Sequence, residues 1–334
     1  MKTTAFVLLT AAATLTAAAG YHVTGKIQIG GEGGWDYATM DSAGRRLYLS
    51  HATRVVVVDP DSGKVVGEIA DTAGVHGIAI APKLNHGYTS NGRSNNVTVF
   101  DLKTLKTVGQ IATGQNPDAI LYEPSTNKVL TFNGRSKDAT VIDAATDKVL
   151  ATIPLGGKPE FAQTDTKGKI YVNIEDTHEV AEIDARNNFV AKRYNLAGCE
   201  EPSGLAFDVK NRRLFSVCAN KVMVVSDPDS GAVVATVPIG QGADGAGFDV
   251  DRGLAFSSNG EGTVTVVRGS GTTYAVAETV QTQHGARTMA VDQKTHKLFL
   301  PTAEFGAMPA ATDQQPRPRP PIVPGTFMVV VVEQ

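Results

Sequence analysis

Short apolar runs separated by turn residues recur along the chain, and residues 199–240 show the pattern most clearly. This stretch contains the runs GLAFDV, RRLFSVC, KVMVVS and AVVATVPI, each bounded by Asp, Asn, Gly, Pro or Ser. Runs of this kind predict four antiparallel strands joined by tight turns. Four strands alone bury little apolar surface, so the unit needs neighbours of its own kind.

The unit repeats along the sequence with a nearly constant period. The residue that ends the first strand of each unit marks the repeat, and successive markers lie 40 to 43 residues apart. The markers are Asp41, Ala81, Glu123, Asp165, Asp208, Asp249 and Asp292. Four strands in each repeat of this length are typical of a β-propeller, whereas helical repeats would show apolar spacings of three and four. The sequence therefore predicts an all-β fold, a seven-bladed propeller of four-stranded antiparallel blades.

The last repeat indicates how the ring closes. Only three strands are expected in it, at residues 288–291, 297–302 and 327–333, and then the sequence ends. Residues 23–30, VTGKIQIG, resemble the fourth strands at residues 149–156 and 233–240. The N-terminal strand is therefore expected to complete the last blade and to leave no unpaired edge there. Residues 20–334 are predicted to form one propeller domain.

Residues 1–19 have the features of a signal peptide. Lys2 precedes an apolar run at residues 5–15, and small residues follow at the cleavage positions. The run is too short to span a membrane, and no later stretch reaches the required length. We therefore expect a periplasmic or secreted protein without a membrane span, although an N-terminal helix of the domain is the alternative.

The charge balance argues against a nucleic-acid partner. Without Lys2, the chain keeps 30 basic and 34 acidic residues, and aromatic residues make up only 6% of the sequence. A polyanion is usually held by a basic stripe, and the sequence has no basic block of that kind. Nucleic acid is therefore an unexpected partner.

The two cysteines are predicted to form a disulfide. Cys199 lies in the link into the fifth blade, and Cys218 ends the second strand of that blade. Pairing the strands about a turn at residues 210–211 places Cys218 opposite Ser203, four residues from Cys199. An oxidising compartment favours a bridge between them. Two buried thiols or a redox pair are the alternatives, but the CxxC spacing of redox motifs is absent.

One position in each repeat is expected to surround the central tunnel. It lies five residues before each marker, where the chain enters the innermost strand. Its occupants are Asp36, His76, Asp118, Glu160, Ser203, Asp244 and Arg287. Crowded carboxylates raise one another's pKa unless a cation lies among them. A divalent metal, an amine or Arg287 could supply that cation, whereas the alternative is that the acids only cap turns. Trp35, the sole tryptophan, is expected either to stack on a ligand or to pack between blades one and seven.

A second set of rim residues comes from the loops that follow the second strands. The segments NGRS at residues 91–94 and 133–136 are near copies in adjacent repeats. Asn-Gly favours positive φ, which would explain the turn but not the arginines. Arg93 and Arg135 could together hold a carboxylate or a phosphate, or they could be solvated surface residues.

Residues 304–324 interrupt the last repeat. Their proline content excludes strand pairing and favours an extended loop. The segment is expected to be either a surface loop or a flap over the tunnel mouth.

The repeat resembles the periplasmic YVTN/YncE-like family of seven-bladed propellers. The signature strand of that family is approximated by YVNI at residues 171–174, YTSN at 88–91 and FNG at 132–134, although no literal YVTN occurs. The resemblance covers nearly the whole chain after residue 19 and implies the fold. It also implies single-stranded DNA binding as one candidate function.

No sequence motif identifies an enzyme. HExxH, P-loop and GxSxG patterns are all absent. We therefore expect a non-catalytic, monomeric propeller that binds a small ligand or a protein partner at the rim of the tunnel mouth. The alternatives are a lactonase-type or metal-assisted hydrolase and a single-stranded DNA-binding propeller. No cofactor is expected, except that His76 with Asp36 or Asp118 admits a divalent metal.

Overall fold

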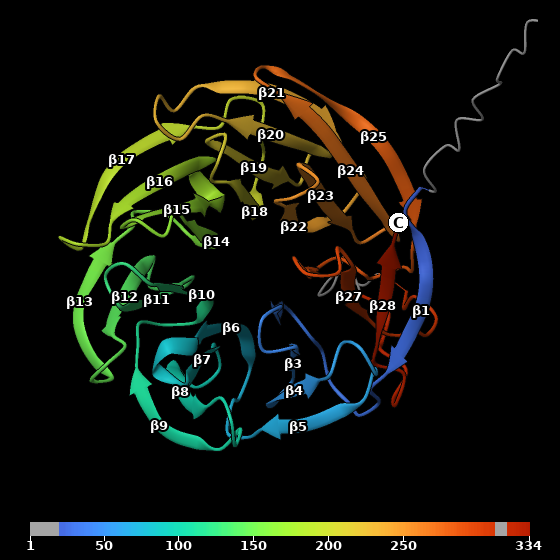
Figure 1. Cartoon of the computed structure of the whole chain (residues 1–334), viewed down its shortest axis with the longest axis horizontal. Coiled ribbons are helices and arrows are strands. Elements are labelled where there is room, and N and C mark those ends of the chain that lie inside the picture. Colours follow the sequence, from blue (N-terminus) through green and yellow to red (C-terminus); the bar gives the residue numbers. More distant parts are fainter. Residues whose placement is uncertain (1–19, 311–318) are drawn as a thin grey trace, which may run out of the picture.

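The computed structural model describes residues 20–310 and 319–334, and the predicted signal peptide lies outside them. Within these residues, 28 strands form seven four-stranded antiparallel sheets arranged as a ring (Figure 1). The predicted all-β seven-bladed propeller is therefore confirmed. Among the described residues, no helix has both the length and the apolar character needed to cross a membrane.

Each blade is ordered from the innermost to the outermost strand, as the sequence pattern predicts. Blades 1 to 3 are β2 (Ala38–Asp41), β3 (Arg46–His51), β4 (Arg54–Val58) and β5 (Val65–Ile69); β6 (Val75–Ala81), β7 (His86–Asn91), β8 (Asn96–Asp101) and β9 (Thr107–Ala112); β10 (Pro117–Glu123), β11 (Lys128–Asn133), β12 (Asp138–Asp143) and β13 (Lys148–Pro154). Blades 4 and 5 are β14 (Pro159–Thr164), β15 (Lys169–Ile174), β16 (Glu179–Asp184) and β17 (Phe189–Asn195); β18 (Pro202–Asp208), β19 (Arg213–Cys218), β20 (Val222–Ser226) and β21 (Val233–Pro238). Blades 6 and 7 are β22 (Ala243–Asp249), β23 (Leu254–Asn259), β24 (Thr263–Ser270) and β25 (Thr273–Gln281); β26 (Ala290–Val291), β27 (Leu298–Thr302), β28 (Met328–Glu333) and β1 (His22–Gln28). Short 3-10 turns occur at Pro82–Leu84 and Glu175–Thr177.

The hydrophobic core lies between blades rather than within them. The second strand of a blade, such as β11 or β15, is buried on both faces, whereas the outermost strand, such as β13, is mostly exposed. One core cluster joins Leu130 and Phe132 of blade 3 to Ile170 and Val172 of blade 4. Burial on both faces explains why these strands read as continuous apolar runs. It also explains why a single repeat would not be stable alone.

The marker acids at the ends of the innermost strands accept hydrogen bonds from side chains of the neighbouring blade. Asp292 of blade 7 accepts from Arg45 of blade 1 at 2.7 Å, and Asp249 of blade 6 accepts from His296 of blade 7 at 2.8 Å. The markers also accept backbone N–H groups of their own turns, as Asp292 does from Lys294 at 3.0 Å. Turn capping and contact between blades therefore both favour an acid at this position.

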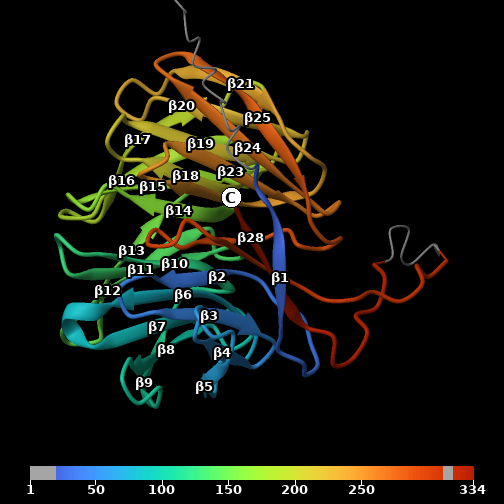
Figure 2. The same cartoon turned by 45° about the vertical axis from the view of Figure 1, so that its right-hand side comes forward.

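The N-terminal strand completes the last blade, as predicted. β1 lies antiparallel to β28 (Figure 2), and their register runs from His22 opposite Glu333 to Gln28 opposite Met328. The pairing joins the two ends of the described chain in one blade and covers the outer edge of β28, which gives the last blade four strands like the others.

The predicted disulfide is confirmed between Cys199 and Cys218, with Cα atoms 5.4 Å apart. The expected register beside it is wrong by one residue, because Cys218 lies opposite Pro202 rather than Ser203. A register shift between Pro202 and Leu205 inserts a bulge that a simple count along the turn does not include.

Reducing this disulfide is expected to lower the free energy of unfolding by about 3 kcal/mol. The two cysteines are 19 residues apart in sequence, and the bridge between them closes a loop that restricts the unfolded chain. Urea unfolding of the oxidised and the reduced protein measures the difference. The Cys199→Ala/Cys218→Ala protein is the control, since a reductant should leave its stability unchanged. Equal stability of the oxidised and reduced wild-type protein would contradict this prediction.

Candidate functional site

Bulges in the innermost strands explain how the ring residues reach the tunnel mouth. The register shifts lie between Val75 and Ile78, Pro117 and Ile120, Pro159 and Ala162, Pro202 and Leu205, and Ala243 and Gly245. In blades 2 to 6, the ring position lies inside this shift. A bulged residue is released from regular pairing and its side chain is re-aimed. The same local feature therefore presents one side chain per blade to the mouth.

Asp36, His76 and Asp118 converge at the mouth from three consecutive blades. The Nδ1 atom of His76 lies 2.6 Å from Oδ2 of Asp36, to which it donates a hydrogen bond, and 3.7 Å from Oδ1 of Asp118. One ligand atom from each side chain lies within 4.8 Å of the others. The structure therefore brings together two carboxylates and one imidazole that are 42 residues or fewer apart along successive repeats.

The other acidic ring residues have cationic partners. The Nε atom of Arg287 lies 2.7 Å from Asp244, and its Nη2 atom lies 3.6 Å from Asp36. Glu160 lies 2.7 Å from the Nζ atom of Lys158, which also contacts Glu175. These contacts neutralise part of the negative charge of the ring.

Ser203 is the one ring residue whose side chain carries no ionisable group. Its hydroxyl donates to the carbonyl of Ala243, 3.3 Å away, which connects blade 5 to blade 6. The next residue, Gly204, could not carry a Cβ, because that atom would lie 2.6 Å from the carbonyl oxygen of Asp244. The small residue after Ser203 therefore lets the innermost strands of blades 5 and 6 approach each other closely.

Burial and charge–charge interactions shift the pKa values of several ring residues. Burial, reinforced by Asp36, raises the pKa of Asp118 to about 7. Burial and the negative charge of Asp118 also raise the pKa of Glu160, against the opposing effect of Lys158. Burial alone would lower the pKa of His76, but the hydrogen bond to Asp36 and the charge of Asp118 outweigh it and raise that pKa. The mouth is therefore a site where a cation is favoured.

Two aromatic residues, each directly after a ring position, contact each other across the tunnel. The rings of Tyr37 and Phe161 lie 5.0 Å apart between centroids. They come from blades 1 and 4, which stand on opposite sides of the ring (Figure 1), so they meet across the axis. Burial first, and then the four carboxylates of the ring, raise the pKa of Tyr37 well above its usual range. The sequence reasoning did not find this pair, although small residues follow the ring position at Gly77, Ala119, Gly204 and Gly245 while Tyr37 and Phe161 break that pattern.

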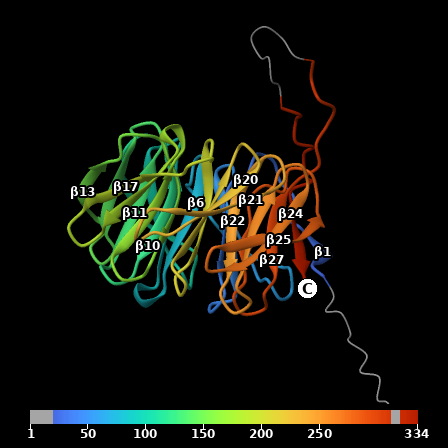
Figure 3. The same ribbon diagram turned by 90° about the horizontal axis from the view of Figure 1, so that it is seen from above.

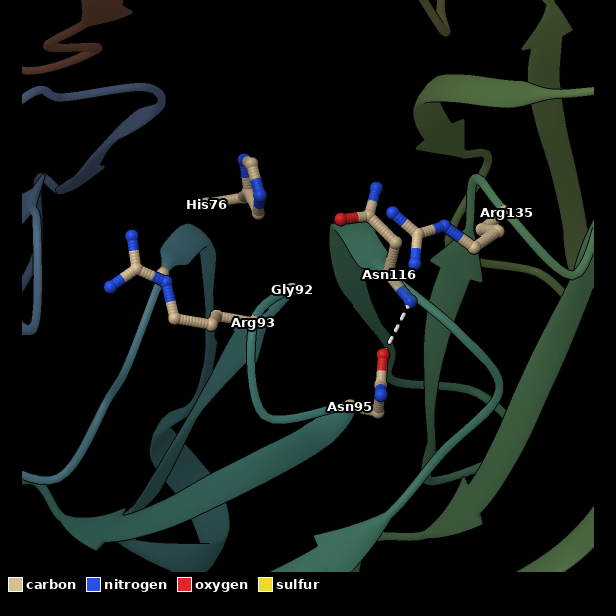
Figure 4. Close-up of a pocket in the computed structure, with 7 residues that line it drawn as sticks. His76, Gly92, Arg93, Asn95, Asn116 and Arg135 are labelled. Atoms are coloured by element: carbon tan, nitrogen blue, oxygen red, sulfur yellow. Dashed lines mark hydrogen bonds between the residues drawn. The ribbon is translucent and has the colours of Figure 1, made fainter.

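Arg93 and Arg135 line one cavity of about 430 Å³ beside the ring. Figure 4 shows Arg93 next to His76 and Arg135 next to Asn116, on neighbouring blades. Both arginines are exposed, and neither makes an ion pair with any residue in the described parts of the chain. Their guanidinium groups are therefore available to a ligand.

The expected role of the Asn-Gly pairs in these loops is wrong. Positive φ falls on Asn95 and Lys137 rather than on the Asn-Gly residues. Asn91 is instead buried at the end of β7 and donates to Thr98 at 2.9 Å. Gly92 is required because a Cβ there would lie 2.6 Å from Nε2 of His76. The repeated segment therefore supports the rim and positions His76.

Trp35 packs between blades one and seven rather than standing exposed at the mouth. It is 7% exposed and stacks on Phe327, with a centroid separation of 5.5 Å.

The described ends of the insertion at residues 304–324 are joined by a bridge between Phe305 and Ile322 and project away from the disc (Figure 3). With Trp35 and Arg287, these two residues line a cavity of about 560 Å³. The base of the insertion therefore forms one wall of the mouth.

The fold and the rim define a seven-bladed propeller whose tunnel mouth is lined by charged residues and bordered by cavities. No family model matches the chain, and no curated protein matches it, so only the fold implied by the YVTN/YncE-like resemblance is confirmed. Among solved structures, the chain is similar to Kuenenia stuttgartiensis hydrazine synthase, with a TM-score of 0.69 and 18% sequence identity. The match covers 80% of this chain and 92% of that chain. Similarity at this level of identity concerns the fold alone.

Proposed function

We propose that this chain is an exported, monomeric binding propeller of the YVTN/YncE-like kind, whose rim binds a small ligand that carries a carboxylate or a phosphate. The observation that carries the proposal is the cavity between Arg93 and Arg135. The disulfide and the lack of a membrane-spanning helix in the described residues are compatible with export.

The lining of this cavity favours an anion. Two arginines, His76 and two asparagines line it, and no carboxylate does. Guanidinium groups bind carboxylate and phosphate through paired, charge-assisted hydrogen bonds. The two groups come from separate loops on adjacent blades, so a ligand bound by both would bridge the blades.

Replacing either arginine should weaken anion binding strongly. For Arg93→Ala and Arg135→Ala we expect a loss of about 2 kcal/mol each, roughly 30-fold in Kd, because a charge-assisted hydrogen bond is lost. Arg135→Lys should bind with intermediate affinity, since lysine keeps the charge but not the paired geometry. Calorimetric titration with inorganic phosphate and with small mono- and dicarboxylates, in the presence of EDTA, measures these affinities.

Arg268→Ala provides the matched control, because Arg268 is exposed on β24 and lines none of the rim cavities. Equal affinities for Arg93→Ala, Arg268→Ala and the wild-type protein would exclude the proposed cavity. A labelled single-stranded oligonucleotide, titrated at increasing salt, tests the DNA-binding alternative. The carboxylates at the mouth oppose a polyanion, so we expect no salt-sensitive binding.

A lactonase-type or metal-assisted hydrolase is the second candidate function. The convergence of Asp36, His76 and Asp118 beside an open cavity favours it, because such reactions need donors that hold a metal or accept a proton. Turnover of sugar or aromatic lactones that requires a divalent metal, and that is lost in Asp118→Asn, would support hydrolysis over simple binding.

A further inference from the structure

We infer that Asp36, His76 and Asp118 bind a divalent transition-metal cation, with Zn²⁺ as its representative. Their ligand atoms lie within 4.8 Å of one another, and their side chains are 19%, 29% and 13% exposed. They are therefore largely shielded from bulk water. This inference does not depend on the anion proposal, because the metal alone serves as the probe.

The charge balance of the ring singles out Asp118. Glu160 has Lys158 as its partner at 2.7 Å, and Asp244 has Arg287 at 2.7 Å. By contrast, Oδ1 of Asp118 is buried and has no hydrogen-bond partner among the described residues, and the nearest cationic group is His76 at 3.7 Å. A buried carboxylate oxygen without a partner is costly. A cation between Asp118 and Asp36 would satisfy it.

The donor set fits a transition metal better than Ca²⁺ or Mg²⁺. Imidazole nitrogen is a common ligand of zinc and its neighbours, whereas Ca²⁺ and Mg²⁺ prefer oxygen alone. Three protein ligands with one open position are the usual arrangement of a reactive zinc site. A cavity of about 360 Å³ borders Asp36 and His76, two of the three residues, and leaves room for a water or a ligand in that position.

The surroundings prepare the histidine to bind through Nδ1. Gly92 lies so close to Nε2 of His76 that even a Cβ there would clash at 2.6 Å, so the Nδ1 edge faces the two carboxylates. Metal binding at Nδ1 displaces the proton now donated to Asp36: the imidazolium form of His76 releases it to solvent, whereas in the neutral form the proton passes to Nε2, so the imidazole stays neutral in the complex. Arg287, 3.6 Å from Oδ1 of Asp36, would hold that carboxylate in place from behind.

Titration of the untagged, metal-free protein with Zn²⁺ tests the site. We expect Zn²⁺ alone, at 100 times its Kd, to raise the Tm by about 4 °C. Ca²⁺ and Mg²⁺ should have smaller effects. Asp118→Asn should weaken Zn²⁺ binding by more than about 100-fold, since substitutions outside the ligand set already weaken metal sites 10- to 100-fold. Glu160→Gln, a ring acid outside the ligand set, should change the affinity by no more than about threefold.

The metal-free proteins keep this test independent of folding. Without metal, Asp118→Asn should be at least as stable as the wild-type protein, because it removes a buried charge without a partner. Loss of Zn²⁺ stabilisation in a variant that is equally or more stable therefore supports the site. Absence of Zn²⁺ binding, or equal Zn²⁺ affinity of the wild-type, Asp118→Asn and Glu160→Gln proteins, would overturn it. Because anion binding is measured in EDTA, either proposal can fail without the other.

Discussion

A chain that begins at Gly31 instead of Gly20 is expected to lose its cooperative thermal transition, or to melt at least about 10 °C lower. The deletion removes β1, which pairs with β28 from His22 opposite Glu333 to Gln28 opposite Met328. β28 is an almost continuous run of buried valines, and it would become an edge strand. An unpaired apolar edge promotes association between chains. Calorimetry and light scattering of the two chains measure both effects.

A synthetic peptide of residues 20–30 provides the complementary experiment. Added to the shortened chain, it should recover part of the lost Tm, because a strand can be donated to an open sheet edge from a separate molecule. A scrambled peptide of the same composition should not. A shortened chain that melts cooperatively at the wild-type temperature would show that closure by β1 contributes little to stability.

The fold could be predicted because the residues that mark the repeat have two physical roles, in capping a turn and in contacting the next blade. An acid such as Asp249 or Asp292 is favoured both by its own turn and by a donor from the next blade. Strands buried on both faces add long apolar runs at fixed intervals. What could not be predicted was the register at the start of the inner strands. A bulge depends on local backbone geometry rather than on a residue type, so Cys218 was expected one residue away from its partner.

In the candidate site, too, some residues could be predicted from the sequence and others could not. Asp36, His76 and Asp118 could be placed together because each has an equivalent position in the repeat, and Arg287 could be assigned to the same ring. Lys158 was not predicted, because it lies outside that position and reaches Glu160 through its long side chain.

Tyr37 and Phe161 were missed for another reason. Their contact crosses the axis between blades 1 and 4, and no spacing along the sequence encodes a contact of this kind. A large residue where four of the other repeats have glycine or alanine is the sequence signal for it.

Replacing Asp292 with asparagine is expected to lower the free energy of unfolding by about 3 kcal/mol. The carboxylate is fully buried and accepts hydrogen bonds from Arg45 at 2.7 Å and Thr295 at 2.6 Å. Asparagine has nearly the same shape but no charge, so it leaves a largely buried guanidinium group without its buried partner. Because Arg45 belongs to blade 1 and Asp292 to blade 7, the change weakens the joint at which the ring closes. Urea unfolding at neutral pH measures the loss.

Asp61→Asn is the matched control, because Asp61 binds the same arginine but is 59% exposed. An exposed ion pair is screened by water and contributes little to stability, so the two variants separate the effect of burial from that of the ion pair. The difference in the free energy of unfolding between the wild-type and Asp292→Asn proteins should also depend on pH. Burial alone would raise the pKa of Asp292, but the hydrogen bonds from Thr295 and Arg45 outweigh it and hold that pKa below its ordinary value. The stabilisation is therefore complete above the pKa of the unfolded chain and is lost as the pH falls through the folded value. Equal losses for the two variants, or a loss for Asp292→Asn that does not shrink in acid, would place the stability of the joint elsewhere.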